Sequence, residues 1–268
     1  MSNARKKKKA GQQTAAKRAN KYELYEESVQ NTEHSVEFVD RIYRKANDRR
    51  PMVLREDFCG TAMLCADWVA SHQARRAIGI DLDPEPLESG RERHLSRVGD
   101  AAKRVKLING DVLEGCGEKV DAIVAHNFSY WVFHERADLK DYFRAACKGL
   151  AEGGTFLLDV YGGIEAQTEM EEDRDCEGFT YIWDQKSFDP ITNNLKCAIH
   201  FRMNDGSMMR NAFTYDWRLW TLPELRDVLV DAGFSTVDTY WEGNDDVYRK
   251  VKRAENWQAW IAYLVAWK

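Results

Sequence analysis

The stretch that decides the fold is VLREDFCGTA, residues 53–62. An apolar run turns acidic at Glu56, a short loop follows through Gly60, and a helix-forming segment begins near Thr61. A helix N-terminus behind such a loop offers free N–H groups and the positive end of a dipole, which suit a carboxylate or a phosphate. An acid at the end of the strand can also accept a hydrogen bond from an ammonium group. The stretch therefore predicts a strand–loop–helix unit that binds a charged ligand.

Around this unit, apolar runs and helical patterns alternate, which indicates βαβ units and a parallel sheet. We expect strands at Met52–Asp57, Arg76–Asp81, Val105–Asn109, Val120–His126, Thr155–Tyr161, Thr236–Trp241 and Gln258–Trp267. We expect helices at 22–47, 61–70, 85–97, 137–150 and 222–232. The fold class predicted is α/β, with a seven-stranded, mostly parallel sheet.

Between residues 178 and 217 the pattern changes to three strand-like segments rich in aromatic residues. The turn cluster Asn204-Asp205-Gly206 joins two of them and is typical of a hairpin. This predicts an antiparallel β insertion after strand five. The expected organisation is a basic disordered tail (1–21), an N-terminal helical segment (22–50), a ligand-binding domain (51–163 and 218–268) and an inserted lid or substrate subdomain (164–217).

The net charge of −5 is divided unevenly along the chain. Residues 1–21 hold eight Lys or Arg residues and no acid, whereas the remainder holds 31 basic and 44 acidic residues. A body this acidic disfavours a broad nucleic-acid surface, because each phosphate contact needs a cation. Nucleic acid therefore remains a candidate partner only through the tail.

Six cysteines without a CxxC pair, and no secretory signal at the N-terminus, favour reduced thiols and a cytoplasmic location. No run approaches the ~18 apolar residues that would cross a bilayer. We expect no membrane partner and no metal site, since Asp81 and Asp83 lack a His or third carboxylate nearby. The sequence says little about the oligomeric state.

Two further acids follow strands in the expected order. Asp81 ends the second strand about 20 residues after the first loop, where an acid accepts hydrogen bonds from ribose hydroxyls in nucleoside-binding sheets. Asp111 follows the third strand in the turn Asn109-Gly110-Asp111. The position of Asp81 is therefore typical of a nucleoside-binding sheet, whereas the Gly110-Asp111 pair alone indicates only a turn.

With these motifs the chain resembles the class I methyltransferases that use S-adenosylmethionine (SAM), whose first motif is D/E-x-G-x-G-x-G. Glu56 matches the acid and Gly60 the middle glycine, whereas Phe58 and Ala62 stand where the family has glycine. The late segments LAEGGTF (150–156) and WTLPEL (220–225) also resemble the family. The resemblance implies SAM as cofactor, with binding residues Glu56, Cys59, Gly60, Ala62, Asp81, Leu82, Asp111, Val112 and Asn127. In it, Leu82 packs on the adenine and Asp111 holds the adenine amino group.

The function predicted is transfer of a methyl group from SAM to a nitrogen or oxygen nucleophile of a small molecule, under the inserted lid. Candidate acceptor-binding residues are Ser129, Tyr181, Trp183 and Arg218. The catalytic group is open; candidates for a proton acceptor are His126, Tyr161 and Tyr25.

Three alternatives remain at this point. The chain could methylate RNA or protein, with the basic tail aiding binding, or it could be a non-catalytic SAM-binding scaffold. A nicotinamide-dependent dehydrogenase shares the sheet and the ribose acid, but it needs G-x-G-x-x-G for its pyrophosphate. Phe58 leaves little room for a pyrophosphate, which disfavours the dehydrogenase.

Overall fold

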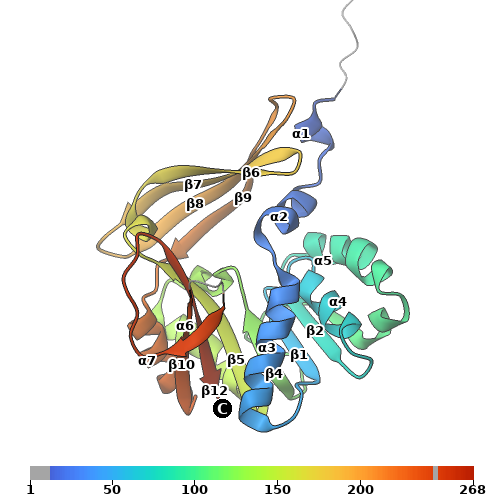
Figure 1. The fold of residues 1–268 in the computed structure, drawn as a ribbon, viewed down its shortest axis with the longest axis vertical. Coiled ribbons are helices and arrows are strands. Elements are labelled where there is room, and N and C mark those ends of the chain that lie inside the picture. Colours follow the sequence, from blue (N-terminus) through green and yellow to red (C-terminus); the bar gives the residue numbers. More distant parts are fainter. Residues whose placement is uncertain (1–12, 244–246) are drawn as a thin grey trace, which may run out of the picture.

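A computed structural model describes residues 13–243 and 247–268. Its main body is a mixed sheet of eight strands in the order β11-β10-β12-β5-β4-β1-β2-β3 (Figure 1). In chain order, these strands are β1 (Val53–Asp57), β2 (Arg76–Asp81), β3 (Val105–Asn109), β4 (Val120–Ala125), β5 (Leu150–Gly162), β10 (Thr236–Glu242), β11 (Tyr248–Val251) and β12 (Trp260–Trp267).

Strands β1 to β5 pair in parallel, with β1 at the centre between β2 and β4. All six residues of β4 are buried, as expected for a parallel strand covered on both faces. The chain runs from β1 outward to β3, then returns to β4 on the other side of β1. In open α/β sheets the ligand cleft lies at this reversal, outside the carboxyl ends of the strands.

Two helical layers cover the sheet and define two core clusters. Side chains of α3 and α4, including Phe38 and Trp68, pack on one face, and those of α6 and α7, including Phe143 and Leu229, pack on the other. The helices are α1 (Ala15–Arg18), α2 (Lys21–Val29), α3 (Thr32–Asn47), α4 (Met63–Ala70), α5 (Pro84–Gly90), α6 (Arg136–Gly149) and α7 (Leu222–Ala232). The shorter helices are the π-helix Arg91–Leu95 and the 3₁₀ helices Gly99–Arg104, Ser129–Val132 and Glu165–Gln167.

The α/β class, the mostly parallel sheet and the antiparallel insertion are confirmed, with two strands that the sequence pattern did not reveal. β11 adds an eighth strand at the edge of the main sheet. The expected helix 22–47 divides at Gln30 and Asn31 into α2 and α3, because the Asn31 side chain caps the second helix by accepting from His34 N.

The insertion forms its own antiparallel sheet in the order β6-β7-β8-β9. Figure 1 shows it above the main sheet, in yellow to orange, over the end where the parallel strands finish. Its strands are β6 (Met170–Cys176), β7 (Phe179–Asp189), β8 (Asn194–Met203) and β9 (Met208–Arg218). β6 is the second strand that the sequence pattern did not reveal, because its acidic sequence MEEDRDC lacks apolar alternation.

Residues 13–21 of the expected tail contain ordered structure, and residues 1–12 lie outside the described residues. The backbone N–H groups of Ala15 and Ala16, in α1, donate to Asp205 and Ser207 on the β8–β9 hairpin, at 2.9 and 3.0 Å. The prediction of disorder up to residue 21 is therefore wrong for this part, because these contacts hold α1 on the inserted sheet.

Helix α2 bridges the inserted sheet and the main domain. On one side Tyr25 packs on Phe213 of β9, with ring centroids 4.9 Å apart. On the other side the buried Glu26 carboxylate accepts from Thr61 Oγ1 at 2.5 Å and contacts His94 Nε2 at 2.8 Å. The partners Thr61, His94 and Arg93 hold the pKa of Glu26 below its usual range, although burial opposes them. Helix α2 is thereby fixed over the cleft.

Within the described residues, no helix combines the length and apolar character needed to cross a membrane. All six cysteines carry free thiols.

Candidate cofactor and acceptor site

The loop between β1 and α4 follows a glycine-type path. Phe58, Gly60 and Ala62 have φ angles of +56°, +52° and +54°, the left-handed region that favours glycine. These are the three positions at which the resembling motif carries glycine. The Phe58 ring packs on Tyr142, with centroids 5.5 Å apart. The two substitutions therefore keep the backbone conformation that the motif requires.

Asp81 ties this loop to the end of β2. Its carboxylate accepts from Gly60 N at 2.7 Å and from Asp83 N at 2.9 Å. Burial raises the pKa of Asp81, and the two N–H donors oppose that shift. The neighbouring Leu82 is 69% exposed, so its apolar side chain is accessible to a ligand. Together they present a carboxylate and an apolar surface side by side.

The turn after β3 lies against this pair. Asn109 donates through Nδ2 to the carbonyl of Leu82 at 2.8 Å, and Gly110 N donates to the carbonyl of Asp81 at 3.0 Å. Asp111 accepts from Leu113 N at 2.9 Å, and Val112 is buried. The structure thus brings the predicted adenosine-binding residues together at one edge of the sheet.

Glu56 lies deeper in the cleft. It is buried and accepts from Cys65 N at 3.1 Å, at the start of α4. Burial raises the pKa of Glu56 to about 8, so the free protein keeps most of this carboxyl group protonated at neutral pH. A cationic ligand group beside it would favour the ionised form. The predicted residues Cys59 and Ala62 are buried members of the β1–α4 loop, in which Ala62 N donates to Cys59 O at 2.7 Å.

A cavity of about 260 Å³ opens beside Glu56, beneath the turn between α2 and α3. Two buried polar atoms there, Gln30 Oε1 and His126 Nε2, have no hydrogen-bond partner among the described residues. Asn127 lines the same cavity. An unpaired buried polar group is costly unless a ligand or water meets it. The residues present therefore fit the amino-acid end of SAM, with Glu56 facing its ammonium group.

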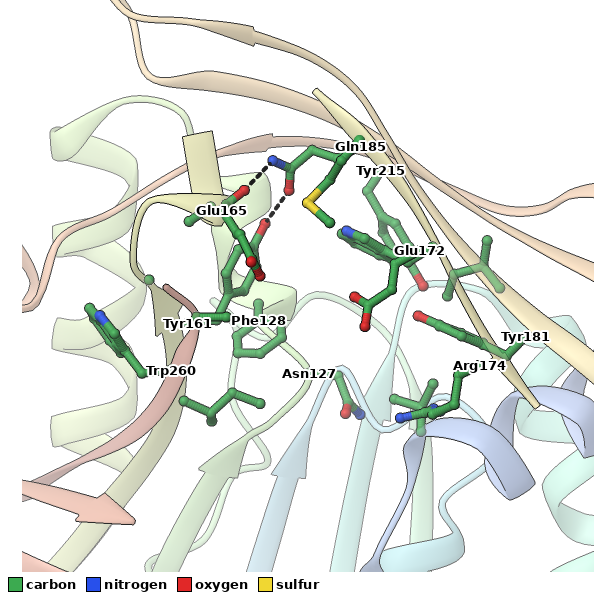
Figure 2. A pocket seen from close by; sticks show the side chains of 18 of the residues that line it. Asn127, Phe128, Tyr161, Glu165, Glu172, Arg174, Tyr181, Gln185, Tyr215 and Trp260 are labelled. Carbon is green, nitrogen blue, oxygen red and sulfur yellow. Dashed lines mark hydrogen bonds between the residues drawn. The ribbon is translucent and has the colours of Figure 1, made fainter. Parts of the chain in front are cut away.

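A second cavity, of about 440 Å³, lies between the main sheet and the inserted sheet (Figure 2). It adjoins the first, since Asn127, Phe128 and Tyr181 line both. Aromatic side chains of both sheets and of α2 form much of its wall: Tyr25, Phe128, Tyr161, Tyr181, Trp183, Tyr215, Trp217 and Trp260. The position is that of an acceptor pocket next to a cofactor cleft.

Of the four side chains expected to bind the acceptor, Tyr181 and Trp183 line this cavity. Ser129 and Arg218 do not. The Ser129 hydroxyl donates to the carbonyl of His126 at 2.9 Å. Arg218 stacks 3.8 Å above the Trp220 ring and donates to the carbonyl of His134 at 2.9 Å, so it fastens β9 to the main domain.

The three candidate proton acceptors differ in their surroundings. Burial lowers the pKa of His126 to about 4, which makes its imidazole neutral at pH 7 and a weak base. Tyr161 and Tyr25 line the larger cavity, and burial raises the pKa of each phenol above its ordinary value. These phenols are suited to orienting an acceptor by hydrogen bonds in their neutral form.

Asp159 is a site residue that the sequence analysis missed. Its buried carboxylate accepts from Asn127 N at 2.7 Å and from Phe128 N at 3.0 Å, and burial raises its pKa to about 7. Both partners have positive φ angles, 57° and 56°. Asp159 therefore holds the strained loop after β4 in place. One signal was available, an isolated acid inside the apolar run FLLDVY (156–161).

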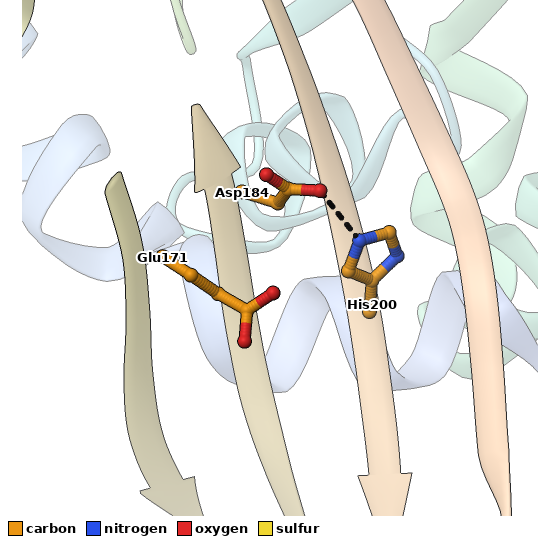
Figure 3. A group of neighbouring side chains, drawn as sticks. All are labelled: Glu171, Asp184 and His200. Atoms are coloured by element: carbon orange, nitrogen blue, oxygen red, sulfur yellow. Dashed lines mark hydrogen bonds and ion pairs between the residues drawn. The ribbon is translucent and has the colours of Figure 1, made fainter. Parts of the chain in front are cut away.

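One described group has the composition of a metal site: Glu171, Asp184 and His200 on the inserted sheet (Figure 3). His200 Nδ1 accepts from Asn211 N at 2.7 Å, which places its ring proton on Nε2, 3.0 Å from Asp184. That nitrogen then has no lone pair for a cation. His200 therefore links three strands by hydrogen bonds, through Asp184 of β7 and Asn211 N of β9.

Gly60→Ala is expected to weaken SAM binding more than tenfold. A Cβ at Gly60 would meet no protein atom within 4 Å, so it would project into the open cleft beside Asp81. Calorimetric titration with SAM measures this effect. Gly99→Ala is the matched control, since Gly99 has a similar φ (+55°) and an equally open Cβ position. Gly99 precedes the amino end of β3, whereas the proposed cofactor cleft lies at the carboxyl ends of the strands. Both variants should lose about 1 kcal/mol of stability. Equal SAM affinity in the two variants would contradict the placement of the cofactor.

Comparison with known proteins agrees with this geometry. Residues 59–156 match the family described as methyltransferase domain. No curated protein sequence matches the chain.

Solved structures share the fold across nearly the whole chain. A SAM-dependent methyltransferase from Clostridium acetobutylicum is 17% identical, with a TM-score of 0.72, covering 92% of this chain and 96% of its own. An amino pentose methyltransferase from Micromonospora echinaspora, solved with SAM bound, is 17% identical, with a TM-score of 0.66 and coverages of 93% and 97%. A sugar N-methyltransferase from Streptoalloteichus is 16% identical, with a TM-score of 0.65 and coverages of 100% and 99%. These likenesses confirm the fold expected from the sequence, and the family match over residues 59–156 is to a methyltransferase domain, in agreement with the expected enzyme class.

Proposed function

We propose that the chain, whose residues 59–156 match a methyltransferase-domain family, is a class I, SAM-dependent enzyme that transfers the methyl group of SAM to a nitrogen or oxygen nucleophile of a small molecule. The observation that carries this proposal is the 440 Å³ cavity, which adjoins the cofactor cleft at Asn127 and Phe128. Its volume lies within the range of roughly 300–1,000 Å³ that small-molecule pockets occupy.

In the proposed complex, Asp81 accepts hydrogen bonds from the ribose and the exposed Leu82 covers the adenine. Asp111 and the Val112 N–H meet the edge of the adenine, and Glu56 binds the ammonium group. SAM supplies an electrophilic methyl group on a sulfonium. The remaining work of the protein is to position the nucleophile in line with that methyl group and to exclude water.

Three parts of the chain enclose the acceptor in this proposal. The inserted sheet provides Trp183 and Tyr215, the main sheet provides Phe128 and Tyr161, and α2 provides Tyr25. The inserted sheet acts as the lid. The amino pentose and sugar N-methyltransferases that share the fold support a small acceptor by analogy.

Methylation of RNA or protein through the basic tail is the main competing function, and a non-catalytic scaffold is the other. Five basic residues, Arg5 and Lys6–Lys9, fall within the region outside the described residues.

The free thiols of all six cysteines support the further proposal of a cytoplasmic location.

The test is an assay of labelled methyl transfer from SAM to a panel of small amines and alcohols, with the full chain and a variant lacking residues 2–12. Turnover of a small acceptor that is equal in both forms is the expected result. Turnover only of RNA or protein, lost with the tail, would favour the macromolecular function. SAM binding without turnover of any acceptor would favour the scaffold.

A further inference from the structure

The charged side chains around the acceptor cavity are mostly acidic. Among the described residues, Glu165, Glu172 and Glu242 line it, and Arg174 is the one cation. Figure 2 shows the carboxylates of Glu165 and Glu172 directed into the cavity. An acceptor that carries a negative charge would meet unfavourable electrostatics there, whereas a cation would be attracted.

Arg174 is already engaged by the protein. Its Nη2 donates to the carbonyl of Ser28, at the end of α2, and its guanidinium lies 4.9 Å above the Tyr181 ring. These contacts tie β6 to α2. The lining residues that the structure describes therefore offer no unengaged cation for a phosphate or carboxylate group of an acceptor.

Glu172 and Glu165 carry carboxylates without a hydrogen-bond or ion-pair partner among the residues that the structure describes. Glu172 lies on β6 opposite Trp183 of β7. Glu165 is bonded only through its backbone, its carbonyl accepting from Gln185 Nε2 at 2.9 Å. Glu172 is the better placed of the two to meet the acceptor, since it projects toward Asn127 and Phe128, which join the cavity to the cofactor cleft (Figure 2).

Glu172 is exposed on its outer side, and aromatic rings line the cavity beside it. The ring centroid of Trp183 lies 6.0 Å from that of Tyr215 and 6.3 Å from that of Trp217, and the rings of Tyr215 and Trp217 stack with centroids 4.2 Å apart. Burial raises the pKa of the Tyr215 phenol, so it remains neutral and adds no charge. A carboxylate beside aromatic faces is a combination that recognises ammonium groups.

We propose that the acceptor is a primary or secondary amine without phosphate or carboxylate groups, that it binds as an ammonium ion, and that Glu172 selects it. The proposal rests on the proposed small-molecule methyltransferase function and narrows its substrate class. Glu172 acts here as a specificity residue in ground-state binding, and the ammonium ion then releases one proton to solvent, which frees the nitrogen lone pair that attacks the methyl group.

Three probes of similar shape test this charge selection: phenethylamine, 2-phenylethanol and 3-phenylpropionate. Each is titrated calorimetrically into the full chain saturated with S-adenosylhomocysteine, the demethylated product of SAM. Phenethylamine should bind at least tenfold more tightly than either of the others. Glu172→Gln should lower its affinity about tenfold and leave that of 2-phenylethanol unchanged. Glu171→Gln, the neighbour on β6 that belongs to the group with Asp184 and His200, should behave as the wild type.

Equal binding of the three probes, tightest binding of 3-phenylpropionate, or no binding of phenethylamine would overturn the proposal. So would a Glu172→Gln variant that binds phenethylamine as the wild type does. The readout is binding to the product complex and does not depend on turnover. Failure of the proposed function is recognised separately, by the absence of methyl transfer to any small acceptor in the labelled assay.

Discussion

Asp81→Ala is expected to weaken SAM binding by about a hundredfold or more. In the proposed complex this carboxylate accepts from both ribose hydroxyls, and hydrogen bonds to a charged group contribute roughly 1.5–3 kcal/mol each. The same carboxylate holds Gly60 N at 2.7 Å, so its removal also releases the loop that shapes the cleft. Asp111→Ala should cost less, about tenfold, because it removes a single contact to the adenine amino group. Calorimetric titration with SAM measures both variants.

Asp83→Ala is the control for Asp81. Asp83 is two residues away and exposed, and its side chain caps α5 by accepting from Glu85 N at 2.9 Å. Its loss should lower stability by about 1 kcal/mol and leave SAM affinity unchanged. If Asp81→Ala and Asp111→Ala both bound SAM as tightly as the wild type, the assignment of the adenosine site would be wrong.

The affinity for SAM is expected to rise about tenfold from pH 6 to pH 7. Burial raises the pKa of Glu56 to about 8 in the free protein, and the proposed contact with the SAM ammonium requires the ionised form. Below that pKa, each pH unit increases the ionised fraction about tenfold, and SAM binding releases a proton. This rise in SAM affinity is expected only below about pH 7.5, because the α-amino group of SAM itself loses its proton at about pH 8. Titrations in buffers with different ionisation enthalpies measure the proton release.

Glu56→Gln should bind SAM more weakly and with no rise between pH 6 and pH 7. The same variant has a predictable effect on stability. The pKa of Glu56 is raised on folding, so its stabilising contribution is present below the pKa of the unfolded chain and is lost as the pH approaches about 8. Thermal unfolding of Glu56→Gln should therefore depend less on pH between 5 and 8. A pH-independent SAM affinity in the wild type would contradict the placement of the ammonium group at Glu56.

The cofactor half of the site was predictable because it depends on local patterns in a fixed order. Acids end β1 and β2 and follow β3, and the carboxyl ends of parallel strands meet at one edge of a sheet. The loop at Phe58 illustrates how far such a pattern reaches. Its backbone adopts the left-handed angle of the motif although the residue is not glycine.

The acceptor half was predictable only in part, because it depends on how distant segments pack. Two of the four acceptor-binding candidates, Tyr181 and Trp183, line the cavity, but no local pattern could show that Arg218 stacks on Trp220 instead of facing the cavity. Glu172 was missed because the acidic β6 does not have the pattern of a strand. Gln30, which lies in the turn between two helices, was missed because the sequence predicts one continuous helix there.

The most direct test of the central claim is a calorimetric titration of the purified chain with SAM, S-adenosylhomocysteine and NAD. Saturable binding of the first two in the micromolar range, with no heat from NAD, is the result that the cleft at Glu56, Gly60 and Asp81 predicts. Binding of NAD, or no binding of SAM and S-adenosylhomocysteine, would contradict the account.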